Sequence, residues 1–194
     1  MRICSRAVVL GLVLLASAPG TATAEIVRHR DPVGDVAASP VGRNAYGPAP
    51  TQVQGDIVAT RVSFARRAVW IRYRLQDLAT TGNGNFHVVG LESDRKSLSL
   101  EIDAFPGHWE GRSTATGERS AALGCAVAHR IDYDRNQVRV RVSRSCLGRA
   151  SWVRVGIRTT VAGSTYAYVD DARATGYSAD LHYGRRVHRE PRVP

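Results

Sequence analysis

Apolar and polar residues alternate with a period of two through much of the chain. The clearest runs cover residues 69–76, 138–142 and 153–158, where aliphatic residues or tyrosine alternate mainly with arginine. Successive side chains of a strand point to opposite faces, so this pattern predicts strands with one buried and one solvated face. Shorter candidate strands cover residues 56–64, 86–92, 97–103 and 165–169.

Turn-forming residues separate these segments, and no convincing helical period lies between them. About eight short strands, each with one solvated face, predict an all-β protein. We therefore expect a single antiparallel β-sandwich of the jelly-roll type with one disulfide, built from residues 25–183. Two long stretches, residues 39–55 and 106–124, are expected to be loops. The arginine-rich residues 184–194 are expected to be a basic disordered tail.

The first residues have the pattern of a secretory signal peptide. Arg2 and Arg6 precede a short apolar run, residues 7–18, and Ala22-Thr23-Ala24 supplies small residues for cleavage before Glu25. The run is too short to span a bilayer comfortably, and the alternative is a buried N-terminal helix. We expect residues 1–24 to be removed and the mature chain to be secreted as a soluble monomer without a transmembrane segment.

The chain is basic, and arginine supplies almost all of the positive charge. The net charge is +10, from 27 basic and 17 acidic residues, and Lys96 is the only lysine. Six arginines of predicted strands lie on the solvated faces: Arg72, Arg74, Arg139, Arg141, Arg154 and Arg158. If their strands are neighbours, they form one basic face, for which we take Arg72, Arg74, Arg139 and Arg141 as the candidate ligand-binding residues. Such a face would bind an anionic extracellular polymer or glycan, although an arginine-rich proteome would produce the same pattern without a ligand. Export argues against genomic nucleic acid as the partner.

Two cysteines remain after the expected cleavage, Cys125 and Cys146. An exported chain meets an oxidising compartment, where such a pair usually forms a disulfide. A hairpin that turns at Arg135-Asn136 would place Cys125 directly opposite Cys146 and Tyr133 opposite Val138. Directly opposed residues lie within disulfide reach, so we expect this bridge.

Aspartates cluster near both ends of the predicted sandwich. The segment Asp31-Pro-Val-Gly-Asp35 is followed by Asp56, and Asp170-Asp171 lies near the other end. First and last strands of a sandwich often lie close together, and Ca²⁺ takes six to eight oxygen ligands. We therefore expect these five aspartates to hold a structural calcium ion. The alternative is that they only build turns and cap strand ends.

The spacing of these motifs resembles that of DOMON-like β-sandwiches, which are related to family 9 carbohydrate-binding modules. The resemblance lies in Asp31-Pro-x-Gly-Asp35, Asp56-Ile57 and Asp77-Leu78. The segments around Cys146 and Tyr168-x-Asp170-Asp171 are similar to small secreted actinobacterial proteins. The resemblance implies a jelly-roll sandwich, often with bound calcium and sometimes with sugar or haem. The pair of tryptophans that grips sugar in family 9 modules has no counterpart here.

Two further features bear on function. Trp109 lies between glycines in a predicted loop, where an exposed indole would stack on a sugar or else fold back over the core. The segment Glu101-Ile-Asp103-Ala-Phe resembles laminarinase-type glycosidases, but proline stands where their second catalytic glutamate belongs. We therefore expect a non-enzymatic binding module. The alternatives are a small glycosidase that uses Glu101 and Asp103, and an extracellular interaction or inhibitor protein.

Overall fold

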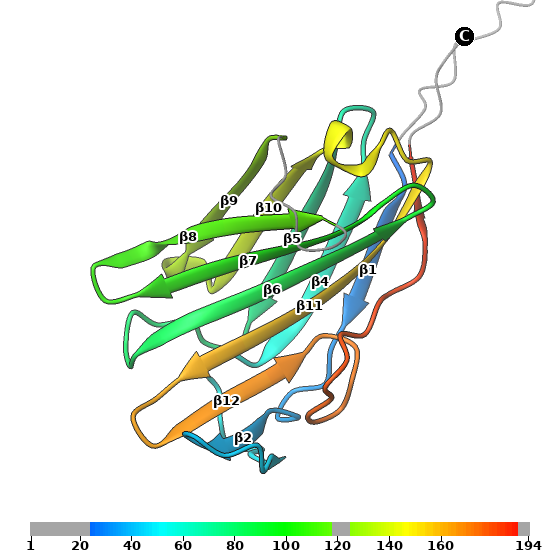
Figure 1. Cartoon of the computed structure of the whole chain (residues 1–194). Helices are drawn as coiled ribbons and strands as arrows, with labels where there is room; N and C mark the ends of the chain where they lie inside the picture. The colour runs from blue at the N-terminus through cyan, green and yellow to red at the C-terminus, as the bar shows by residue number, and fades with distance from the viewer. Residues whose placement is uncertain (1–23, 118–124, 190–194) are drawn as a thin grey trace, which may run out of the picture.

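The computed structural model describes residues 24–117 and 125–189, and it is an antiparallel β-sandwich, as the alternation predicts (Figure 1). One sheet has five strands in the order β1-β4-β5-β10-β9. Their bounds are β1 Ile26–Arg30, β4 Ile57–Phe64, β5 Ala68–Leu75, β10 Gln137–Ser143 and β9 Val127–Asp132. No α-helix occurs among the described residues, and none of them forms a helix that could cross a membrane.

The second sheet has the order β3-β2-β12-β11-β6-β7-β8, and the short β13 pairs with β11 beside this path. Its strands are β3 Gly47–Pro48, β2 Ala37–Pro40, β12 Tyr166–Asp171, β11 Trp152–Ala162, β6 Gly84–Ser93, β7 Ser97–Phe105, β8 His108–Gly117 and β13 Val187–His188. This larger sheet lies in front of the five-stranded sheet in Figure 1.

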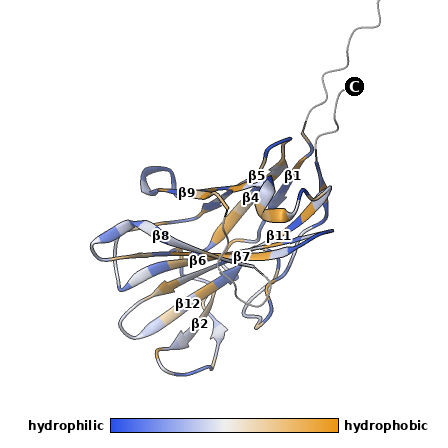
Figure 2. Ribbon diagram, turned by 45° about the horizontal axis from the view of Figure 1, so that its top comes forward, coloured by the Kyte–Doolittle hydropathy of each residue, from blue (hydrophilic) through white to orange (hydrophobic). Residues whose placement is uncertain are grey.

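The core forms where the two sheets face each other. Every second residue of the central strands is buried, and Phe64, Tyr73, Leu91 and Leu100 are fully enclosed. In Figure 2 the hydrophobic colour follows strands such as β4 and β11, whereas the β8 edge is mostly hydrophilic. The burial of these apolar faces is the main contribution that holds the sheets together.

The hairpin of β9 and β10 forms in a different register from the predicted one. Val138 pairs with Ile131 and not with Tyr133. A two-residue turn at Arg135-Asn136 would require positive φ at both residues, which arginine disfavours. Instead Tyr133–Arg135 form a 3-10 turn, and Asn136 alone adopts the left-handed conformation with φ 49°. The shift of two residues keeps every side chain on its predicted face.

The predicted disulfide between Cys125 and Cys146 is confirmed, with Cα atoms 5.4 Å apart. Cys125 lies just before β9, and Cys146 lies in the 3-10 turn Arg144–Leu147 that follows β10. The bridge forms in spite of the changed register because this turn brings Cys146 back toward the edge of β9. A loop of this length contributes about 3 kcal/mol in the chain-entropy model.

Three segments that the composition predicts to be loops or tail contain strands. Residues 108–117 form β8, which pairs along β7, and residues 39–55 contain part of β2 and all of β3. The edge strand β8 is polar on both faces, so its alternation is weak. The expected disordered tail is also wrong for residues 184–189, because Val187 is buried and pairs with Val153. The signal-peptide prediction for residues 1–24 lies almost wholly outside the described residues, as do 118–124 and 190–194.

Candidate metal centre and arginine face

Four aspartates meet where the chain crosses from one sheet to the other. The crossing segment joins β1 of the five-stranded sheet to β2 of the second sheet and contains Asp31 and Asp35. Asp56 stands directly before β4, and Asp170 lies on β12. Gly34 permits the tight crossing: its φ is +81°, and a Cβ there would lie 2.9 Å from the Pro50 carbonyl oxygen.

We call these four carboxylates the acidic centre; three of them converge on one buried point, and Asp56 lies beside them. Asp31, Asp35 and Asp170 each offer a carboxylate oxygen, and these three oxygens lie within 4.8 Å of one another. The Gly34 amide donates to Oδ2 of Asp56 at 2.8 Å, and the Ile57 amide donates to Oδ2 of Asp170 at 2.6 Å. These two bonds orient Asp56 and Asp170 and leave the other oxygen of each free to face the centre.

Five carboxylate oxygens of the acidic centre are buried and have no hydrogen-bond partner. They are Oδ2 of Asp31, both oxygens of Asp35, Oδ1 of Asp56 and Oδ1 of Asp170. Burying an ionised carboxylate without a partner is very costly, so such groups either take up protons or bind a cation. These oxygens can accept but not donate when ionised, which is the donor set that a hard cation such as Ca²⁺ prefers. The residues therefore fit a bound divalent cation.

Burial raises the pKa values of all four carboxyl groups of the acidic centre. Burial, followed by repulsion from Asp170 and the other aspartates, raises the pKa of Asp31 to about 8. Burial chiefly raises the pKa of Asp170 to about 7, and it also raises the pKa values of Asp35 and Asp56. A neighbouring imidazole, that of His29, lies 3.6 Å from Asp31, but burial and Arg173 lower its pKa and favour its neutral form.

Asp171 does not join the acidic centre. It follows Asp170 on β12, and adjacent residues of a strand point to opposite faces. Its carboxylate instead contacts Arg158 Nη2 at 3.3 Å and His182 Nδ1 at 3.5 Å on the outer side of the sheet. Five aspartates were expected at the site; the structure brings Asp31, Asp35 and Asp170 within ligand distance of one another, with Asp56 beside them and Asp171 apart.

The outer face of the five-stranded sheet, which we call the arginine face, carries one unbroken row of guanidinium groups. The pairing registers align one arginine from each strand in the order Arg28, Arg61, Arg72, Arg139 and Arg130. Neighbouring strands lie about 4.8 Å apart, so the row crosses the whole sheet at right angles to the strands. We call this row the arginine ladder.

The positive charge of this face is almost uncompensated. Arg30, Arg74 and Arg141 lie on the same face as the ladder. Within the described ranges, none of these eight arginines has a carboxylate within 4.0 Å. The strands of this face contribute a single acid, Asp132, which is mostly buried and pairs with Arg135. Arg72, Arg74, Arg139 and Arg141 therefore share one face, as the alternation indicates, together with four arginines that the sequence reasoning missed. Arg154 and Arg158 do not join them, because their strand, β11, belongs to the other sheet.

The missed arginines have a signal that could have found them. Arg61 lies in the predicted strand 56–64, on the polar side of its alternation, and Arg28 and Arg30 alternate with Val27 and His29. A turn at Arg135-Asn136 would place Arg130 opposite Arg141, whereas the true register places it opposite Arg139. Which arginines line up across strands depends on register, which the alternation alone leaves open.

Trp70 projects from the arginine face, two residues before Arg72 on β5. Its side chain is 50% exposed, and the Arg141 guanidinium lies over the indole, 5.5 Å from the ring centroid. The indole borders two hollows, one lined by Arg61, Ser63, Arg72 and Arg139 and the other by Arg130, Arg139 and Arg141. The alternating pattern gave no reason to single out this tryptophan. Trp70 occupies one of the outward positions of β5, and the next two outward positions hold Arg72 and Arg74.

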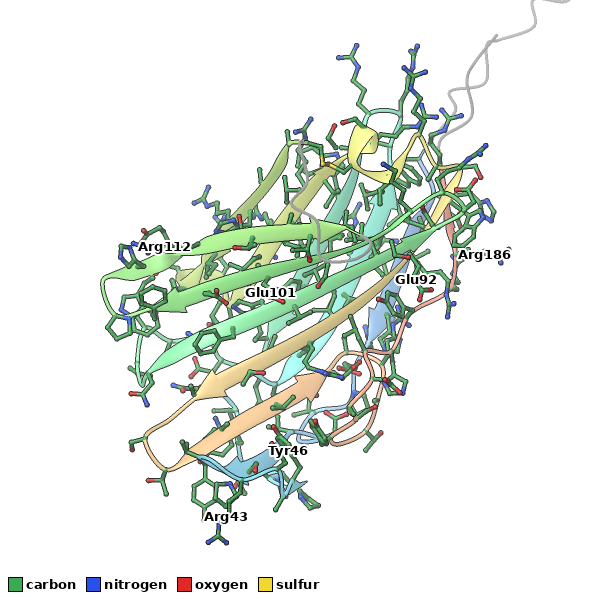
Figure 3. All side chains as sticks on the ribbon, in the orientation of Figure 1. Arg43, Tyr46, Glu92, Glu101, Arg112 and Arg186 are labelled. Atoms are coloured by element: carbon green, nitrogen blue, oxygen red, sulfur yellow. A yellow bond between two sulfur atoms is a disulfide. The ribbon has the colours of Figure 1, made fainter. Side chains whose placement is uncertain are left out.

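Two other features that the sequence singled out, Trp109 and the pair Glu101 and Asp103, lie outside both the acidic centre and the arginine face. Trp109 lies on β8 and not in a loop; its ring meets Tyr133 edge to face, and its carbonyl accepts a hydrogen bond from the Tyr133 hydroxyl at 2.8 Å. Figure 3 shows Glu101 along β7 and Arg112 toward one end of β8. Glu101 and Asp103 share the outer face of β7, and the residues that pair with Glu101, Val88 and Thr114, carry no carboxylate.

Comparisons of the chain with protein-family models, with curated proteins and with solved structures found no match.

Proposed function

We propose that the chain is an exported, non-enzymatic module that binds an anionic extracellular polymer through the arginine face and holds Ca²⁺ as a structural ion. The arginine ladder carries this proposal. Like charges placed directly opposite on neighbouring strands destabilise a sheet, and this face repeats that arrangement across all five strands. An anionic polymer would remove the repulsion along the whole row at once.

The chemistry of arginine suits such a partner. The guanidinium group keeps its charge at all physiological pH values and forms paired hydrogen bonds to carboxylate, sulfate or phosphate oxygens. The sheet holds the ladder at a fixed spacing, so little backbone ordering is needed when a polymer binds. Each contact in such a row is weak in water, and the affinity comes from many contacts made together.

The acidic centre supplies rigidity and takes no part in binding the polymer. Asp31, Asp35 and Asp170 would hold the calcium ion, and Asp56 would complete the set of oxygen ligands. Bound there, the ion would neutralise the negative charge of the buried carboxylates. It would tie the crossing segment between β1 and β2 to the start of β4 and to β12. This contribution is to stability, because binding to the folded state alone shifts the folding equilibrium.

Retention of the purified protein on cell-wall preparations and on an immobilised acidic polymer tests the proposal. We expect retention at low salt that is lost as NaCl is raised, and a loss of more than tenfold in affinity for R72S/R139S. The matched control is R66S/R67S, which removes the same charge from the exposed turn between β4 and β5. Absence of retention at low salt, or equal losses for the two double variants, would overturn the proposal.

A further inference from the structure

We infer that the polymer is an acidic polysaccharide with one anionic group per sugar, that it crosses the strands along the arginine ladder, and that one of its sugar rings stacks on Trp70. This inference rests on the proposed function and specifies its ligand.

The direction of the polymer follows from how the arginines are distributed. Along any one strand, the arginine face offers at most two arginines in succession, such as Arg72 and Arg74 on β5. Across the strands it offers five. A chain that lies across the strands therefore meets the longest row of charge.

The spacing of that row favours a polysaccharide. Charges along a strand recur about every 6.7 Å, because alternate residues share a face, whereas charges across the strands recur about every 4.8 Å. The shorter repeat is close to the length of one sugar residue, so a polymer with one acidic group per sugar matches the ladder step by step. A phosphodiester chain has a longer repeat and would leave some guanidinium groups without a partner.

Trp70 supplies a contact that a purely ionic polymer would not use. Its half-exposed indole lies beside the ladder, between the two hollows that ladder arginines line. An indole offers a large flat surface at little entropic cost, and the apolar face of a sugar ring packs well against it. Arg141 lies over the same ring and contributes a further positive charge next to this platform.

Single-stranded nucleic acid is the competing ligand, because it also combines charge with stacking. Proteins that bind it stack successive bases on several aromatic side chains. On the described part of the arginine face, Trp70 is the one exposed large aromatic residue; the exposed Tyr166 and Tyr177 belong to the other sheet and its flanking loop. A single platform beside a long row of charge matches a glycan better than a run of bases.

The test compares three probes of equal charge number at one ionic strength: polygalacturonate, inorganic polyphosphate and oligo(dT). We expect polygalacturonate to bind most tightly. W70A should lose roughly tenfold in affinity for polygalacturonate, the size of one lost stacking contact, and should bind polyphosphate within about twofold of the wild type. W70F should restore most of the lost affinity. Y166A, which removes a comparably exposed aromatic ring from β12, is the matched control and should change nothing.

Thermal melting of W70A first establishes that the variant is folded. An affinity for polygalacturonate that W70A leaves unchanged would overturn the inference, as would tighter, Trp70-dependent binding of oligo(dT). In both cases a loss of binding in R72S/R139S would leave the proposed function intact. If no probe binds at low salt, the inference and the proposed function fail together.

Discussion

The molecule contains two groups of like charges, one buried and one exposed to solvent. The acidic centre gathers four carboxylates in the interior between the sheets, whereas the arginine face spreads eight guanidinium groups over an exposed surface. In the interior the carboxylates take up protons or need a cation, as the raised pKa values of Asp31 and Asp170 show. On the surface the arginines stay charged.

The two groups of charges behave differently because only the exposed group is solvated by water. Exposed charges are solvated, and at physiological salt they are screened beyond about 8 Å, so a row of arginines costs little. Buried charges interact through a medium of low dielectric constant, and their repulsion persists until a proton or an ion neutralises it. The buried cluster therefore suits a small resident ion, and the exposed row remains available to an exchangeable polymer.

The largest expected effect is that of Ca²⁺ on the acidic centre. At a hundred times its dissociation constant, Ca²⁺ should add about 2.7 kcal/mol to the free energy of unfolding. For a chain of this size, that raises the melting midpoint by roughly 5–10 °C. The measurement is a calorimetric melt of chelator-treated protein at pH 8, with and without CaCl₂.

Two variants sharpen this prediction. D35N should abolish the rise, and D134N, which removes an exposed carboxylate in the turn between β9 and β10, should preserve it. NaCl at the same ionic strength should not reproduce the effect. If the melting midpoint of metal-free wild-type protein does not respond to Ca²⁺, the acidic centre does not bind this ion.

The next effect is the pH dependence of the metal-free protein. Between pH 6.5 and 8.5 the aspartates of the unfolded chain are already ionised, whereas folded Asp31 and Asp170 lose their protons there, with pKa values of about 8 and 7. The folded state binds more protons, so the free energy of unfolding should fall as pH rises. We expect the midpoint to drop by roughly 5 °C over this window.

The pH window starts at 6.5 because His87 also contributes to the pH dependence below that value. Burial lowers the pKa of His87 to about 3, so below pH 6.5 the unfolded chain binds an extra proton there. This proton opposes the contribution of Asp31 and Asp170 and makes the pH dependence shallower. Saturating Ca²⁺ should remove the fall between pH 6.5 and 8.5. A midpoint that rises through this window without metal would contradict the assignment of Asp31 and Asp170 as the shifted groups.

The sequence alone predicted the sandwich, the disulfide and the grouping of Asp31, Asp35 and Asp170, because alternation and turn residues are local signals. It did not predict which charges align, because register depends on turn geometry: the 3-10 turn at Tyr133–Arg135 moved Arg130 opposite Arg139. It also could not separate Asp170 from Asp171, since both are acidic and only the face of β12 distinguishes them. Trp70 was overlooked although the alternation over residues 69–76 places it on the solvated face, because what makes it notable is its position between hollows lined by arginines of other strands.

The smallest expected effect concerns the free arginine face. R72Q removes the charge at the centre of the ladder and should relieve about 0.2–1 kcal/mol of repulsion. The midpoint of the unliganded protein should rise by roughly 1–2 °C at low salt. In 0.5 M NaCl the rise should disappear, and R66Q should show neither effect. A lower midpoint for R72Q at low salt would show that the arginine stabilises the sheet and is not held there for a ligand.

The salt dependence of polymer binding tests the central claim most directly. For binding that releases counterions from a polyanion, the logarithm of the affinity falls linearly with the logarithm of the salt concentration, and the slope counts the contacts. We expect R72Q and R72Q/R139Q to reduce the slope by roughly 0.7 and 1.4, and R66Q/R67Q to leave it unchanged. Equal slopes for all four proteins would contradict this claim, because the polymer would then bind elsewhere.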